Sequence, residues 1–169
     1  MGTVKWGILG AAKIAKEQVI PAMKKSKNTE LYAIASRDIS KAEDFCHKFA
    51  ITKAYDDYNK LISDPNIDAV YIPLPNHLHV PFSINALKAG KHVLCEKPIS
   101  ITSDEIFQLM QVQKETKKIV SEAFMVRFHP QWTETKKLIQ EGEIGKLNAI
   151  QGLFNYFNTD PNNIRIDVR

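Results

Sequence analysis

The sequence predicts an α/β fold: a doubly wound parallel sheet of about six strands, followed by the start of a smaller α+β domain. Two observations predict it. Short apolar runs rich in branched residues alternate with amphipathic helical patterns throughout residues 1–122. Such alternation requires right-handed crossovers between parallel strands. Hydrophobic residues make up 44% of the chain and charged residues 25%, as in ordinary globular proteins.

The strands are predicted where apolar residues run together without a helical period. In chain order they cover residues 4–9, 31–36, 52–55, 69–72, 92–95 and 119–122. The helix after the first strand carries Ala15, Val19 and Met23 on one face. Pro21 is expected to bend or divide this helix, because proline has no N–H to donate.

Two capping boxes mark where later helices begin: Ser40 with Glu43, and Thr102 with Glu105. Gly90 is expected to end the helix that precedes it, and a short helix is expected to stop before residues 64–65. The apolar stripes of these helices are Ala42, Phe45, Cys46 and Phe49; Leu61 and Ile62; Val80, Ile84 and Leu87; and Ile106, Leu109 and Met110.

The pattern changes after residue 122. A helix is predicted over residues 131–140, then a turn between Gly142 and Gly145, an alternating strand over 146–157 and a loop over 158–163. A long strand without a partner leaves an unpaired edge, which folds normally cover. We therefore expect residues 1–122 to form one domain, and residues 123–169 to be the incomplete start of a second, C-terminal domain.

Charge and cysteine content exclude several classes of protein. The net charge is +4, but the lysines fall in short runs without interleaved aromatic residues, which indicates solvated helix faces rather than a nucleic-acid surface. Cys46 and Cys95 have no metal-site or disulfide spacing. No apolar run approaches the roughly 20 residues that span a membrane, and the N-terminus lacks a signal-peptide pattern. We expect a cytoplasmic protein without a metal, a membrane or a nucleic-acid partner.

The first strand leads directly into residues 10–15, which read Gly-Ala-Ala-Lys-Ile-Ala and approximate the phosphate-binding pattern G-x-G-x-x-G/A. Gly10 allows the tight turn, and Ala15 allows close helix–strand packing. Ala12 stands where a second glycine is usual, so the approach of a pyrophosphate is tighter. The alternative is an ordinary strand-to-helix turn. Its place between the first strand and first helix favours a Rossmann-type dinucleotide site.

The end of the second strand bears on the choice of dinucleotide. An NAD-selective site usually has an acidic residue there, whereas Ser36 and Arg37 can both bond a 2′-phosphate. This favours NADP over NAD. Asp38 is an alternative: if the strand runs longer, its carboxylate could bind the ribose diol of NAD instead.

Polar residues also follow the fourth and fifth strands. His77 and His79 lie two positions apart and would not share a helix face, so a metal pair is not expected; a site role and a polar helix start are equally compatible with them. Lys97 could donate to a substrate oxygen, and as a base it would need a lowered pKa. A surface salt bridge between Glu96 and Lys97 is the alternative.

Five segments together resemble the Gfo/Idh/MocA oxidoreductases: residues 7–15, 35–38, 74–79, 95–98 and 122–130. The resemblance runs over essentially the whole chain. It implies NAD(P)-dependent hydride transfer to or from a sugar, inositol or related alcohol, with NADP favoured. It also implies that residues 123–169 begin the substrate and dimerisation domain.

The resemblance implies a role for each site residue. Lys97 is the expected catalytic residue, which bonds the reacting hydroxyl, and its bond to Pro98 is expected to be cis. Arg127 would lie near substrate or cofactor. The expected cofactor residues are Gly10, Ala12, Lys13 and Ile14 at the pyrophosphate; Ser36, Arg37 and Lys41 at the 2′-phosphate; and Leu74, Asn76, His79, Glu96 and Lys97 toward the nicotinamide.

Family members continue past a segment like residues 163–165 into a helix that supplies a second acid/base residue and a sheet that forms the usual dimer interface. We therefore expect this chain alone to bind cofactor with little turnover, and the complete enzyme to be a homo-oligomer. The alternative function is a non-catalytic NAD(P)-binding sensor or assembly module.

Overall fold

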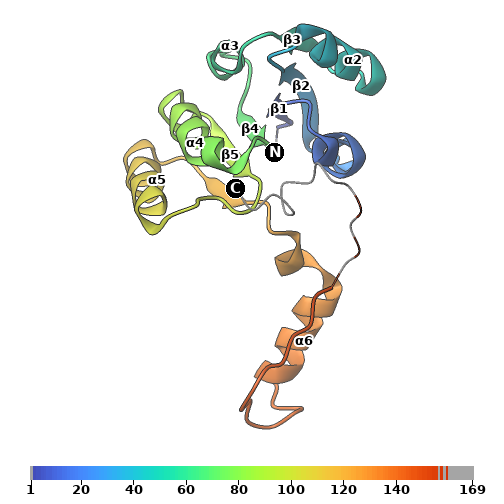
Figure 1. Ribbon diagram of the computed structural model, residues 1–169, viewed down its shortest axis with the longest axis vertical. Coiled ribbons are helices and arrows are strands. Elements are labelled where there is room, and N and C mark those ends of the chain that lie inside the picture. Colours follow the sequence, from blue (N-terminus) through green and yellow to red (C-terminus); the bar gives the residue numbers. More distant parts are fainter. Residues whose placement is uncertain (1, 156, 158, 160–169) are drawn as a thin grey trace. The chain divides into compact units, whose positions relative to one another are not determined.

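The computed structural model describes residues 2–155, 157 and 159 (Figure 1). The chain divides into two compact units, Met1–Phe124 and Met125–Arg169. The expected loop over 158–163 lies outside the described residues except at Thr159. Among the helices that are described, none is both long enough and apolar enough to cross a membrane.

The first unit is built on the expected parallel sheet, which has six strands in the order β3-β2-β1-β4-β5-β6. The strand order reverses between β1 and β4, so their carboxyl ends flank a switch point, where ligands of doubly wound sheets bind. The strands are β1 (Val4–Leu9), β2 (Thr29–Ala35), β3 (Lys53–Tyr55), β4 (Ala69–Ile72), β5 (His92–Cys95) and β6 (Val120–Glu122).

Helices cover both faces of this sheet, because successive strand residues point to opposite sides. Along β4, Val70 and Ile72 join one buried cluster with Leu109 of α5 (Ser103–Thr116), whereas Tyr71 joins the other with Phe45. The first cluster lies under α3 (Tyr58–Ile62), α4 (His79–Lys88) and α5. The second lies under η1 (Ala15–Val19), α1 (Ile20–Lys25) and α2 (Ile39–Phe49).

The first helical segment is divided at Pro21, as predicted. The Ile20 N–H donates to the Ala15 carbonyl, five residues back, and gives the π-helical turn η1 before α1 begins. Proline cannot donate the next helical hydrogen bond, which explains why the regular pattern is interrupted here.

Two sequence expectations about helices were wrong. Ser40 does not cap α2: Asp38 is the N-cap, and its Oδ1 accepts from the Ser40 N–H and hydroxyl at 3.2 and 2.6 Å. Aspartate is as good a cap as serine, so spacing alone did not choose between them. Met110 is 56% exposed and so lies outside the buried stripe of α5, whereas the predicted capping box of Thr102 and Glu105 is confirmed.

The second unit contains η3 (Met125–Phe128) and α6 (Pro130–Gln140), which the side chain of His129 caps. Gly142 and Gly145 flank the expected turn, both with positive φ. The strand predicted over 146–157 is not formed within residues 146–155. A strand exists only through pairing, and no described segment pairs with this one, so alternation of side chains was insufficient.

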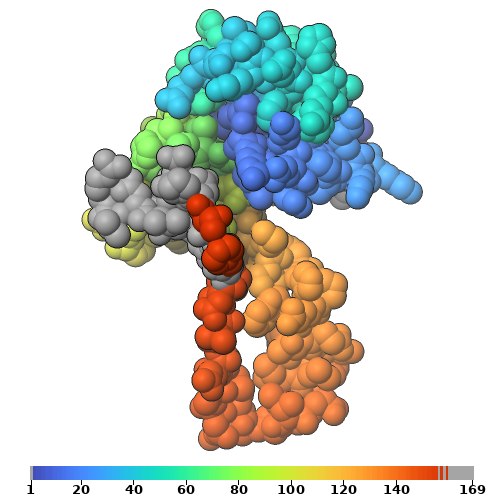
Figure 2. Space-filling model, turned by 45° about the vertical axis from the view of Figure 1, so that its right-hand side comes forward, coloured from blue at the N-terminus to red at the C-terminus, as the bar shows by residue number. Residues whose placement is uncertain are grey.

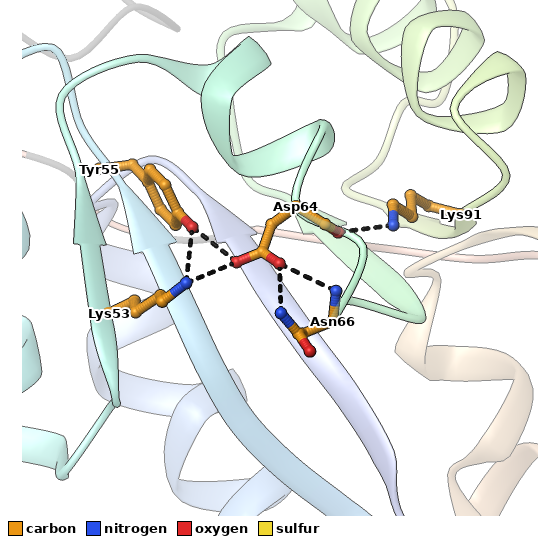
Figure 3. Close-up of polar contacts among 5 residues, drawn as sticks. All are labelled: Lys53, Tyr55, Asp64, Asn66 and Lys91. Atoms are coloured by element: carbon orange, nitrogen blue, oxygen red, sulfur yellow. Dashed lines mark hydrogen bonds and ion pairs between the residues drawn. The ribbon is translucent and has the colours of Figure 1, made fainter.

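A polar network around the buried residues Asp64 and Lys91 fixes the loop before β4, at the amino edge of the sheet (Figure 3). The Asp64 carboxylate accepts from Tyr55 at 2.6 Å, from Lys53 at 3.1 Å and from the Asn66 backbone and side chain at 2.9 Å. The Nζ of Lys91 donates to the carbonyl oxygens of Asp64 and Ile67 at 2.7 and 2.8 Å. Buried charges need such partners, so this network stabilises the loop.

Candidate functional site

The turn after β1 brings the backbone close to neighbouring side chains. Gly10 has φ +111°, and its N–H donates to the Ala35 carbonyl at 2.8 Å. A Cβ at this position would lie 3.0 Å from Cδ2 of Leu74. Both facts require glycine. The helix that follows starts with N–H groups that have no intrahelical acceptor, which makes the turn suited to a phosphate.

A pocket of about 450 Å³ opens beside this turn, between η1 and α2. In Figure 2 the blue segment that includes η1 lies next to the cyan segment that includes α2. Four lysines and two acidic residues give its lining a net charge of +2, which favours an anion. Lys13 and Lys41, both predicted cofactor residues, lie on opposite sides. The lining comprises Ala11, Lys13, Lys16, Glu17, Lys41, Asp44, Phe45 and Lys48.

The residues that follow β2 include two side chains that could bind the ribose of the dinucleotide, Arg37 and Asp38, and their environments differ. Strand β2 stops at Ala35, so Ser36 follows it directly and is buried, whereas Arg37 is exposed. The Asp38 carboxylate is occupied by the start of α2 and lies 3.6 Å from Lys41 Nζ. Hydrogen bonding to Ser40 and the charge of Lys41 outweigh desolvation and lower the pKa of Asp38. Within the described part of the chain, the Arg37 side chain next to Ser36 has no hydrogen-bond or ion-pair partner.

Two loops at the carboxyl ends of β4 and β5 hold the remaining predicted residues. Leu74 is buried, Asn76 and His77 are exposed in η2 (Asn76–Leu78), and Lys97 is exposed after β5. The Lys97–Pro98 bond is cis, as expected. His79 differs: it is 1% exposed, and both ring nitrogens lie against backbone carbonyls. Its ring has no free polar atom for direct contact with a cofactor.

Sequence reasoning missed two residues that hold the loop of Lys97. Tyr71, buried in β4, donates to Glu96 Oε1 at 2.8 Å, and Glu122 at the end of β6 accepts from the Ile99 N–H at 3.0 Å. Burial, and then the hydrogen bond to Glu96, raise the pKa of Tyr71. The sequence did carry a signal for each residue. Tyr71 places a hydroxyl group in an otherwise aliphatic strand, and Glu122 places a carboxylate at the end of another strand.

Residues 4–124 match the model of an oxidoreductase family with an NAD-binding Rossmann fold. The chain belongs to this family, Gfo/Idh/MocA. The fold and family expected from the sequence are therefore confirmed. The matched range ends at the residue where the first compact unit ends.

Several Gfo/Idh/MocA proteins are similar over most of this chain. An uncharacterized oxidoreductase of Rhizobium meliloti is 47% identical over 99% of the chain and 50% of its own length. The D-xylose 1-dehydrogenase (NADP⁺) 2 of Haloferax volcanii is 40% identical over 96% and 50%. A 3-ketoreductase from Actinomadura kijaniata, solved with NADP and TDP-benzene, has a TM-score of 0.80 at 36% identity, covering 86% and 44%. The chain spans about half the length of these relatives.

The other site predictions remain predictions. Arg127 lies in η3 of the second unit. Within the described residues, no cluster of three histidine, cysteine or acidic side chains is arranged to hold a metal ion.

Proposed function

We propose that this chain is the cofactor-binding half of an NADP-dependent oxidoreductase that acts on a sugar, inositol or related alcohol. One observation carries the proposal: the glycine turn and the Lys97 loop lie at the carboxyl ends of β1 and β5, which flank β4. A dinucleotide laid across this edge would have its phosphates at the turn and its nicotinamide toward Lys97.

The residues at the turn fit a dinucleotide. Because Gly10 has no Cβ, the backbone of the turn is open to close approach by a pyrophosphate. Ala12 and Ile14 are half-buried in the same turn. Arg37 and Lys41 supply cations near Ser36, and a guanidinium can bond a phosphate with two parallel N–H groups. These features support NADP in preference to NAD. The names of the xylose dehydrogenase and the ketoreductase complex, which both specify NADP, give the same support.

When bound, the nicotinamide supplies hydride chemistry. Lys97 provides an amino group beside the reacting oxygen of the substrate: as ammonium it can donate a hydrogen bond or a proton to that oxygen, and as the neutral amine it can accept the proton of the hydroxyl. The sugar-like substrates named for the relatives support this substrate class. Homo-oligomeric assembly and a cytoplasmic location belong to the same proposal, the latter supported by the two free cysteines.

A fluorescence titration of the chain with NADPH and NADH tests the cofactor proposal. We expect NADPH to bind at least about tenfold more tightly, since a bond to a charged phosphate contributes about 1.5–3 kcal/mol. Arg37→Ala should remove most of this preference. Lys27→Ala, which removes an exposed lysine elsewhere, is the control. Equal affinities, or no binding, would contradict the proposal.

The second candidate is a non-catalytic NAD(P)-binding module, and the NAD-binding family match is compatible with it. Sugar and polyol oxidation, followed by reduced-nicotinamide absorbance in the longest gene product that contains this chain, separates the two. Cofactor binding without oxidation of any substrate in a broad panel of sugars and polyols would favour the module.

A further inference from the structure

His79 links the two loops that follow β4 and β5. Its Nδ1 lies 2.7 Å from the Pro98 carbonyl oxygen, and its Nε2 lies 2.7 Å from the Leu74 carbonyl oxygen. Carbonyl oxygens only accept, so each contact is a hydrogen bond when the facing nitrogen carries a proton. The ring is 1% exposed, so water does not compete for these positions.

The segment Glu96–Ile99 is held from several directions. The Glu96 N–H donates to the Ile72 carbonyl at 3.0 Å, and its carboxylate accepts from Tyr71. The Ile99 N–H donates to Glu122. His79 adds the contact to the carbonyl of Pro98, so the backbone on both sides of Lys97 is fixed.

The Lys97 side chain itself lacks any such support. It is exposed, and within the described chain its Nζ has no hydrogen-bond or ion-pair partner. The position of the amine therefore depends on the backbone that carries it. A displacement of about 1 Å in a catalytic group can cost on the order of a hundredfold in rate.

We infer that His79 is a positioning residue, which acts on Lys97 by holding the Pro98 carbonyl. This inference rests on the proposed catalytic role of Lys97 and replaces the direct cofactor contact expected for His79. The link through Nε2 to Leu74 is separate, because Leu74 packs beside the glycine turn.

Two conservative variants separate these links. In His79→Asn the amide nitrogen takes approximately the place of Nδ1 and can still donate to Pro98. In His79→Gln it takes approximately the place of Nε2 and can still donate to Leu74. We expect the Pro98 link to position Lys97. In the longest gene product that contains this chain, His79→Gln should then lower kcat for sugar or polyol oxidation by about tenfold or more, while His79→Asn should lower it by no more than about threefold.

Lys91 offers a matched control at the opposite edge of the sheet. It too is buried and bonds two backbone carbonyls, those of Asp64 and Ile67 (Figure 3). Lys91→Met should destabilise the fold without changing kcat at a temperature where the protein stays folded. If both His79 variants lose kcat equally, or if kcat follows stability in all three variants, His79 is only structural.

Hydrogen exchange on the 169-residue chain tests the link without activity. The amides of Glu96 and Ile99 should exchange about tenfold faster in His79→Gln than in His79→Asn, because only the latter keeps the Pro98 contact. Equal exchange rates would overturn the inference. If exchange separates the variants but the longest gene product oxidises no sugar or polyol, the proposed function fails and the His79–Pro98 link stands.

Discussion

The phenolic oxygen of Tyr71, buried within β4, lies 2.8 Å from Oε1 of Glu96 at the end of β5. This bond joins the interior of the sheet to the loop that carries Lys97. Glu96 also accepts from the Lys97 N–H through its other oxygen, at 3.3 Å. One carboxylate thus connects a core side chain to the backbone of the proposed catalytic residue.

Tyr71→Phe should reduce the unfolding free energy at pH 7 by about 1–2 kcal/mol, because a half-buried carboxylate loses its donor. It should also change the alkaline behaviour. The folded-state pKa of Tyr71 is raised above the unfolded value of about 10, so its contribution is present below pH 10 and is lost as the pH rises further. Urea unfolding between pH 7 and 11 should show that the unfolding free energy of the variant declines less steeply with rising pH than that of the unaltered chain.

The decline that remains in that variant has more than one source, since burial raises the pKa of the Cys95 thiol to about 12. Burial, and then the hydrogen bond to Asp64, raise the pKa of Tyr55 as well. A decline above pH 10 as steep as in the unaltered chain would show that Tyr71 contributes nothing to it.

Asp64→Asn should reduce the unfolding free energy by about 2–3 kcal/mol at pH 7, since an amide group faces Lys53 where the carboxylate accepted. Burial alone would raise the pKa of Asp64, but hydrogen bonds from Tyr55, Asn66 and Lys53 outweigh it and lower the pKa. The contribution is therefore present above the unfolded pKa of about 3.9 and is lost as the pH falls below it.

Urea unfolding between pH 2 and 7 measures this effect. The unfolding free energy of the variant should decline less steeply as the pH falls than that of the unaltered chain. NADPH affinity should be unchanged, because Asp64 lies at the amino edge of the sheet. A variant with the acid sensitivity of the unaltered chain would exclude Asp64 as its source.

Gly10→Ala should weaken NADPH binding by at least about tenfold and reduce stability by about 1–3 kcal/mol. Its φ of +111° disfavours a side chain, and the added Cβ would lie 3.0 Å from Leu74. Gly90→Ala is the control, because Gly90 also has a positive φ (+80°) but an added Cβ would meet Cε of Lys118 only at 4.0 Å, an ordinary van der Waals distance, far along the chain from the turn. It should lose stability but keep its NADPH affinity; equal loss of affinity in both would show that backbone strain alone was responsible.

Lys97→Met should abolish sugar or polyol oxidation in the longest gene product that contains this chain, with a loss of at least about a hundredfold in kcat. NADPH affinity, measured by fluorescence on the 169-residue chain, should fall by a much smaller factor than kcat, because Lys97 faces only the nicotinamide end in the proposed site and the phosphates lie at the Gly10 turn. Retained activity would assign the proton transfer to another group.

Local pattern was sufficient for most elements of the first unit. Strands β1, β4 and β5 have the predicted bounds because each is a buried, branched run that ends at a turn. Local pattern gave wrong predictions in two places. At Asp38 two residues could each cap the helix, and over 146–155 the alternating residues have no described strand to pair with. Among the site residues, Gly10 could be predicted from the sequence, because a glycine between a strand and a helix is a local pattern typical of a tight turn.

The amino-acid pattern alone was enough to predict the parallel α/β fold, the family and the positions of the glycine turn and Lys97 at strand ends. The contacts that hold the Lys97 loop in place became visible only in the folded chain. Tyr71 and Glu96 are 25 residues apart, His79 and Pro98 are 19, and Ile99 and Glu122 are 23. These contacts depend on the register between neighbouring parallel strands and on the path of the loops, which hydrophobic period and capping residues do not specify.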